Sequence, residues 1–238
     1  MFDSDKAKRY ASILNKYDIS VSLLCAYFNP VHSVKNKTVV AIEKFKNHLE
    51  YSHMIGCQCV GTETGSYNDD QWTYNDKNRS LEAYHQVLNI FQELVFTAES
   101  TKSLVAIEGA YNHVIYSPQL LKKLIDDLNS NHSRVIVDLY NYLDISNYQK
   151  RYEIFDEAIR LLKNKIVIFH LKDFIREGNK LKQVGLGQGL MDFEYLISTI
   201  VANCPNADLI FEGVTGTDIP SSISHIKNII KRGKHGCK

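Results

Sequence analysis

Short apolar runs alternate with longer amphipathic segments along the whole chain. Runs such as VIVDL and IVIFHL stay almost continuously apolar until they meet a charged or polar residue. Parallel strands that are covered on both faces have this pattern. We therefore predict six strands, at Ile19–Cys25, Cys57–Thr62, Leu104–Glu108, Arg134–Leu139, Lys165–Leu171 and Ala207–Glu212.

The segments between these strands carry apolar residues at helical spacing. Ser117 is a suitable N-cap, and Pro118 follows at the first helical position, where proline is favoured. Gly56 stands where a helix would end in a left-handed residue. We predict helices at Asp5–Lys16, Val34–Ile55, Asn78–Ser100, Ser117–Asn129, Asn147–Asn164, Asp192–Asn203 and Ser221–Arg232.

This alternation predicts stacked βαβ units, which build either a doubly wound sheet or a barrel. A dinucleotide-binding sheet would carry a G-x-G-x-x-G turn after its first strand, and this sequence has none there. Polar residues instead end nearly every strand, as at the mouth of a barrel. We predict one α/β domain over residues 1–238, a TIM (β/α)8-type barrel that lacks the first two strands at the N-terminus.

Composition narrows the function classes. The 28 Lys and Arg residues nearly balance the 27 Asp and Glu residues, which disfavours a dedicated nucleic-acid binder. The N-terminus has no apolar signal region, and no run of 18 apolar residues occurs. The five cysteines, Cys237 included, form no pairing framework, so we predict free thiols. We predict a cytoplasmic protein without a membrane partner.

Four residues at successive strand ends are candidate metal ligands: Glu108, Asp138, His170 and Glu212. Each ends an apolar strand, where a charge is costly unless it is paired or bound to a cation. Three carboxylates and an imidazole suit a divalent ion such as Mn²⁺, Mg²⁺, Co²⁺ or Zn²⁺. The register of all four favours a shared metal site over four independent ion pairs.

The segments AIEGAYNH, VIVDLYN, IFHLKDF, VGLGQGLMDF and LIFEG, in this order and spacing, resemble the sugar phosphate isomerase/epimerase superfamily. This superfamily comprises xylose isomerase-like TIM barrels and includes AP endonuclease family 2. The resemblance implies the same four metal ligands and one divalent ion, for which we favour Mn²⁺. It also implies that Glu108 and Glu212 form the acid/base pair of a sugar isomerase or epimerase in carbohydrate metabolism.

Five further residues are candidate substrate contacts. By resemblance, Arg176 matches a substrate-binding arginine, and Asn141 stands where the ketose 3-epimerases have histidine. Lys172 follows the proposed ligand His170 closely. The single tryptophan, Trp72, lies in a polar loop and could stack on a sugar, and His113 follows Glu108 by five residues. The glycines of VGLGQG form either a tight turn or a phosphate-binding loop before a helix.

Two alternatives remain. An apurinic-site endonuclease would need additional zinc ligands, but Asn141, Leu181 and Gln183 stand at those positions. A truncated barrel could bind metal without turnover. Because two strands are missing from the predicted closure, Ile19–Cys25 and Ala207–Glu212 would be open edges. We expect a second copy of the chain, or the first helix, to cover them, and we favour a homodimer.

Overall fold

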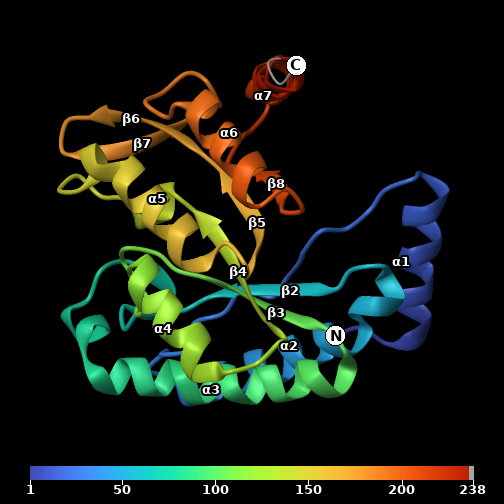
Figure 1. Ribbon diagram of the computed structural model, residues 1–238. Coiled ribbons are helices and arrows are strands. Elements are labelled where there is room, and N and C mark those ends of the chain that lie inside the picture. Colours follow the sequence, from blue (N-terminus) through green and yellow to red (C-terminus); the bar gives the residue numbers. More distant parts are fainter. Residues whose placement is uncertain (236–238) are drawn as a thin grey trace. The chain divides into compact units, whose positions relative to one another are not determined.

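The structure, a computed structural model, describes residues 1–235 (Figure 1). It divides into two compact units, Met1–Ile136 and Val137–Lys238. The prediction of a single domain over 1–238 stays a prediction. Across residues 1–235, no helix combines the length and the apolar character that a membrane span requires. Cys237 lies outside the described residues.

The first unit alternates helices and parallel strands. Its strands pair in the order β1-β2-β3-β4, with Val60 opposite Val105 and Glu63 opposite Glu108. Strand β4 starts in this unit and continues into the second. The elements are α1 (Ser4–Lys16), β1 (Leu24–Cys25), α2 (Lys35–Ile55), β2 (Cys59–Glu63), η1 (Asp69–Gln71), η2 (Asp76–Arg79), α3 (Leu81–Thr101), β3 (Leu104–Glu108), α4 (Pro118–Leu128) and β4 (Ser133–Asp138).

Local chemistry fixes the helix ends of this unit. The Ser117 hydroxyl accepts a hydrogen bond from the Leu120 amide, and Pro118 occupies the first turn of α4. Ser80 caps α3 in the same way. Helix α2 ends at Gly56, which has a left-handed φ of 81°.

The core of the first unit lies between its sheet and its two long helices. In Figure 1, α2 and α3 run side by side below β2 and β3. Phe45 of α2 and Phe91 of α3 are fully buried, as are Val105 and Ile107 of β3. Burial on both faces explains why β3 reads as a continuous apolar run.

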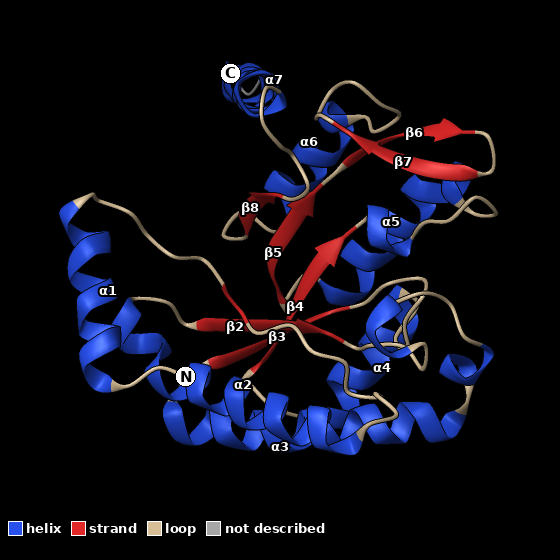
Figure 2. Ribbon diagram, turned by 180° about the vertical axis from the view of Figure 1, so that it is seen from behind, coloured by secondary structure: helices blue, strands red, loops and turns tan. Residues whose placement is uncertain are grey.

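The second unit pairs β5 with β8 in parallel and adds an antiparallel hairpin of β6 and β7, drawn in red in Figure 2. Its core is aromatic, with Phe155, Phe169 and Phe174 buried. The elements are η3 (Tyr140–Tyr142), η4 (Tyr148–Lys150), α5 (Arg151–Leu162), β5 (Ile166–Leu171), β6 (Asp173–Glu177), β7 (Lys180–Val184), α6 (Phe193–Asn203), β8 (Asp208–Phe211) and α7 (Asp218–His235).

All six predicted parallel strands form, but the first is shorter than predicted. It comprises only Leu24–Cys25, because Ile19 and Ser20, at the start of the predicted strand, are exposed and lie outside the sheet. The hairpin of β6 and β7 was not predicted. Most of β7 is exposed or half-buried, so it lacks the apolar run by which the other strands were found.

Candidate metal and active site

Three of the four predicted metal ligands lie together within the second unit. Asp138 ends β4, His170 is near the end of β5, and Glu212 directly follows β8. One ligand atom from each of these three lies within 4.8 Å of the others. The parallel pairing of β5 and β8 brings the last two together at the same strand ends. Two oxygens and one nitrogen therefore converge.

A lysine ammonium lies among these carboxylates. Lys172 Nζ is 2.9 Å from Asp138 Oδ2 and 3.1 Å from Glu212 Oε1. The second oxygen of Glu212, Oε2, lies 2.8 Å from His170 Nδ1. Asp138 is completely buried, so its charge depends on such partners.

The electrostatics of Glu212 follow from these contacts. Burial alone would raise the pKa of this carboxyl group. The close contact with His170 and the positive charge of Lys172 outweigh burial and lower the pKa to about 2. Glu212 is therefore ionised at neutral pH. Its side chain is 43% exposed, so it is the member of the cluster most open to solvent.

The residues present fit a divalent metal ion. Carboxylate oxygens and an imidazole nitrogen form the mixed donor set that Mn²⁺, Mg²⁺ and Zn²⁺ accept. These carboxylates already neutralise one positive charge, because the Lys172 ammonium contacts both Asp138 and Glu212. Asp138, His170 and Glu212 would hold the ion within this unit.

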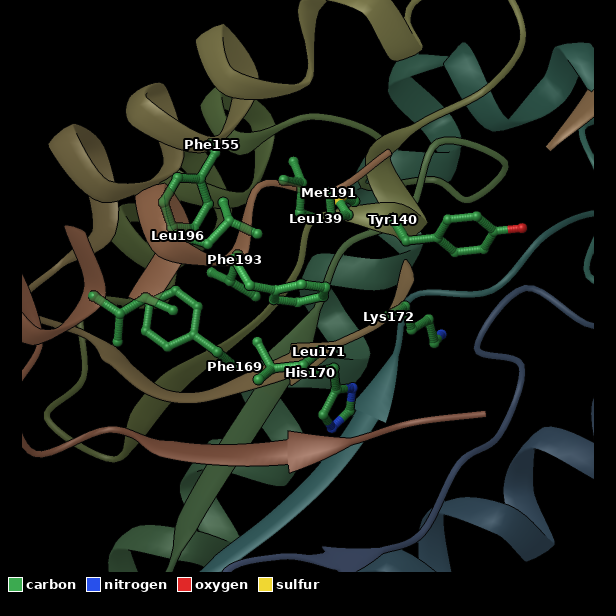
Figure 3. Close-up of a pocket in the computed structure, with 12 residues that line it drawn as sticks. Leu139, Tyr140, Phe155, Phe169, His170, Leu171, Lys172, Met191, Phe193 and Leu196 are labelled. Carbon is green, nitrogen blue, oxygen red and sulfur yellow. The ribbon is translucent and has the colours of Figure 1, made fainter. Parts of the chain in front are cut away.

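An apolar wall supports His170. A cavity of about 10 Å³, room for roughly one water molecule, is lined by Phe155, Phe193 and Leu196 among others. Figure 3 shows the His170 ring pointing away from Phe155 and Leu196. The cavity is too small for a sugar, so this wall packs the strand that carries His170.

Asp173 organises the glycine loop after β7. One of its carboxylate oxygens accepts hydrogen bonds from the amides of Gly187 and Gly189, and the other accepts from Met191 and Phe174. The two glycine amides that a phosphate would need are thus bound to a buried carboxylate. VGLGQG therefore forms a tight turn, which was one of its two predicted forms, rather than a phosphate-binding loop.

Glu108 lies in the first unit, at the end of β3, where it is 1% exposed. The Tyr27 hydroxyl donates a hydrogen bond to its Oε2 over 3.0 Å. Sequence reasoning missed Tyr27. A signal for it existed, since Tyr27 follows the end of β1 by two residues and is a polar aromatic residue at a strand end.

Two other predicted contacts, Trp72 and His113, also lie together in the first unit. Their ring centroids are 5.2 Å apart. Burial, together with the charge of Arg79, lowers the pKa of His113 to about 4, so the imidazole is neutral at pH 7. Arg79 donates to the backbone carbonyl of His113 and stacks 3.6 Å from the Tyr116 ring centroid.

The remaining predicted contacts belong to the second unit. Asn141 Oδ1 accepts a hydrogen bond from Lys172 Nζ over 3.0 Å, and its backbone amide donates to Asp138. Asn141 therefore belongs to the carboxylate–lysine cluster. Arg176 lies on β6, and its Nε donates to the carbonyl of Gly178 in the hairpin turn.

The family assignment rests on a match that covers nearly the whole sequence. A family model described as "Xylose isomerase-like TIM barrel" matches residues 1–229. The chain belongs to this family. The match confirms the predicted superfamily and its α/β TIM-barrel fold class. A search of curated proteins found no match to the sequence.

Solved structures share the xylose isomerase-like fold at low identity. A D-tagatose 3-epimerase-like protein has a TM-score of 0.78 at 14% identity, with 99% of this chain and 86% of that chain covered. A xylose isomerase-like TIM barrel protein from Mycobacterium smegmatis, in complex with magnesium, has a TM-score of 0.76 at 12% identity. The match covers 96% of this chain and 78% of that chain. The IOLI protein with a bound zinc atom has a TM-score of 0.68 at 14% identity, and the match covers 94% of this chain and 80% of that chain.

Proposed function

We propose that this protein is a metal-dependent isomerase or epimerase of a sugar, sugar phosphate or polyol. The observation that carries the proposal is the convergence of Asp138, His170 and Glu212 within 4.8 Å. Structures similar to this chain include a D-tagatose 3-epimerase-like protein and an L-ribulose 3-epimerase, and others have been solved with magnesium and zinc. We favour Mn²⁺ for this protein.

Glu108 completes the proposed ligand set. It pairs in register with Ile136 on β4, and Asp138 lies two residues further along the same strand. Side chains two residues apart on a strand share a face, so this register supports a common face for Glu108 and Asp138.

The chemistry assigned to these residues is proton transfer beside a carbonyl. A bound divalent ion would polarise the substrate carbonyl. One of the two glutamates, Glu108 or Glu212, removes a proton from carbon, and the other returns one. Glu212 is ionised and partly open to solvent, which is the form that can accept the proton removed from carbon. Lys172, Asn141, Arg176, Trp72 and His113 are the proposed substrate contacts.

The test combines metal analysis with isotope exchange. Purified protein is analysed for bound metals, and proton–deuterium exchange at C3 is followed for a panel of ketoses in D₂O. Glu108→Gln and Glu212→Gln should each abolish exchange, because each removes an acid/base group and a metal ligand. The control is Glu177→Gln, which alters an exposed glutamate paired with Lys182.

Other results would favour the alternatives. Bound metal without exchange on any ketose indicates a metal-binding barrel that does not turn over. Cleavage of an oligonucleotide at an abasic site indicates the endonuclease. Unchanged exchange in either glutamine variant contradicts the acid/base assignment, and protein that binds no divalent ion contradicts the proposed function itself.

A further inference from the structure

Lys172 is bound on three sides within the second unit. Its ammonium contacts Asp138 Oδ2 at 2.9 Å, Glu212 Oε1 at 3.1 Å and Asn141 Oδ1 at 3.0 Å. The contact with Asn141 is a hydrogen bond, and the contacts with Asp138 and Glu212 are ion pairs. The side chain is only 8% exposed. Lys172 is therefore a buried member of the cluster and not a charge that water solvates.

The carboxylates that hold Lys172 are also the proposed metal ligands. Both oxygens of Glu212 have partners, because Oε1 faces Lys172 and Oε2 faces His170. A divalent ion that binds Glu212 and Asp138 must share or displace these contacts. It also approaches a fixed positive charge, which repels it.

The charges can be counted within this unit. Asp138 and Glu212 contribute two negative charges, and the Lys172 ammonium cancels one of them. Without the lysine, the charge that these groups present to a divalent ion would be more negative by one unit. Such a difference changes the affinity for a cation even when every ligand atom is retained.

We propose that Lys172 sets the metal affinity of this site by competing with the divalent ion for the carboxylates of Asp138 and Glu212. The inference rests on the proposed function, since it assumes that these residues bind the metal. By drawing carboxylate charge toward itself, the ammonium keeps the metal weakly bound and exchangeable. It also leaves the metal a stronger Lewis acid than two uncompensated carboxylates would.

A purely structural role for Lys172 predicts the opposite result. If the lysine only held Asp138 and Glu212 in place, its removal would disorder the ligands and weaken metal binding. Competition predicts that removal strengthens metal binding. The sign of the change in affinity therefore separates the two roles.

The experiment titrates Mn²⁺ alone into the protein and measures its dissociation constant by calorimetry. Lys172→Gln should bind Mn²⁺ at least about tenfold more tightly than wild type, because a nearby positive charge is gone. Lys172→Arg keeps the charge and should retain affinity close to that of wild type. Lys182→Gln removes a lysine from the exposed pair with Glu177 and should leave the affinity unchanged.

Equal or weaker binding by Lys172→Gln overturns the proposal. If this variant is unfolded alone, refolding on addition of Mn²⁺ supports competition, and failure to refold counts against it. If wild type binds no divalent ion, Mn²⁺ included, the proposed function fails. In that case, binding gained by Lys172→Gln still supports the role of Lys172, and no gain refutes it.

Discussion

The Tyr27 hydroxyl donates a 3.0 Å hydrogen bond to Oε2 of Glu108, which joins the end of β1 to the end of β3 within the first unit. Burial, and then the charge of Glu108, raises the pKa of Tyr27 far above its usual value. The hydroxyl therefore stays protonated at any physiological pH. It is a permanent donor that fixes the orientation of the buried carboxylate.

Tyr27→Phe should lower kcat for proton exchange about 10- to 100-fold, the range expected for losing a hydrogen bond to a charged group. KM should change much less, because the Tyr27 hydroxyl orients Glu108 and does not bind the substrate itself. The matched control is Tyr84→Phe, which removes a similar bond from tyrosine to Asp127 on the helices of the same unit. An equal loss of kcat in both variants would point to general destabilisation.

The buried imidazole of His113 should make stability depend on pH. Its pKa is lowered from 6.5 to about 4 in the folded protein. Between these values the unfolded chain takes up a proton that the folded chain does not, so acidification from pH 6.5 to 4 favours unfolding. The full effect is about 3 kcal/mol at 1.36 kcal/mol per pKa unit, and stability returns as the pH rises.

Urea unfolding at several pH values tests this expectation. The measured quantity is the free energy of unfolding of wild type minus that of His113→Gln. This difference should fall steadily as the pH is lowered from 6.5 to 4, and it should be constant outside that window. A flat difference would mean that His113 takes up its proton equally well in both states. Glutamine keeps a polar side chain at this site, so the comparison isolates the titration.

Asp173 should be among the costliest single substitutions in the second unit. Its carboxylate accepts four backbone hydrogen bonds, and asparagine offers only one acceptor oxygen and two donor hydrogens. We expect Asp173→Asn to lower the free energy of unfolding by about 3 kcal/mol, since buried amides lose their acceptor. Urea titration measures the loss.

Gly189→Ala should also destabilise the turn that Asp173 holds, because it changes a residue of the glycine loop instead of the carboxylate. A Cβ at this position would clash with Asp173 Oδ1 and the carbonyl oxygen of Phe174. Gly178 is a suitable control, because a Cβ there meets nothing within 4 Å. Its left-handed φ of 61° means that Gly178→Ala should cost only about 1 kcal/mol. Equal costs at both sites would contradict the packing of the loop on Asp173.

The open strand edges lead to a prediction about assembly. Helix α1 packs against α2, so we favour a second copy of the chain rather than α1 as the cover. Strand β8, an edge strand in the described sheet, carries half-buried Leu209, Ile210 and Phe211. Light scattering on protein at micromolar concentration should give twice the mass of the 27.3 kDa chain. A monomer that stays soluble would contradict the dimer.

Strands that are buried on both faces were predictable because each leaves an apolar run in the sequence. Leu104–Glu108 was predicted to the residue, and Asp138, His170 and Glu212 were recognised because each interrupts or follows such a run. Helix starts were less accurate. The helix predicted from Asn78 begins at Leu81, because a short 3-10 turn precedes it and Ser80 is the cap.

The parts of the site that escaped prediction depend on contacts between distant segments. The position of Tyr27 just after a strand could mark it as a site residue, but it does not indicate that its hydroxyl meets a residue 81 positions away. Similarly, the sequence suggests that Asp173 either supports the His170 imidazole or is a solvated partner of Lys172. In the structure it is buried and bound to the glycine loop. Periodicity finds elements, whereas the partners of polar side chains are set by tertiary packing.

The segment His170-Leu171-Lys172-Asp173 assigns successive residues to different tasks. His170 and Lys172 face Glu212, whereas Leu171 is buried in the core and Asp173 binds the loop amides. In an extended chain these tasks alternate with a period of two. Inserting or deleting one residue here would exchange the two sides, placing a lysine in the loop anchor and an apolar side chain among the carboxylates. Relatives that keep this chemistry should therefore differ here by substitution and never in length.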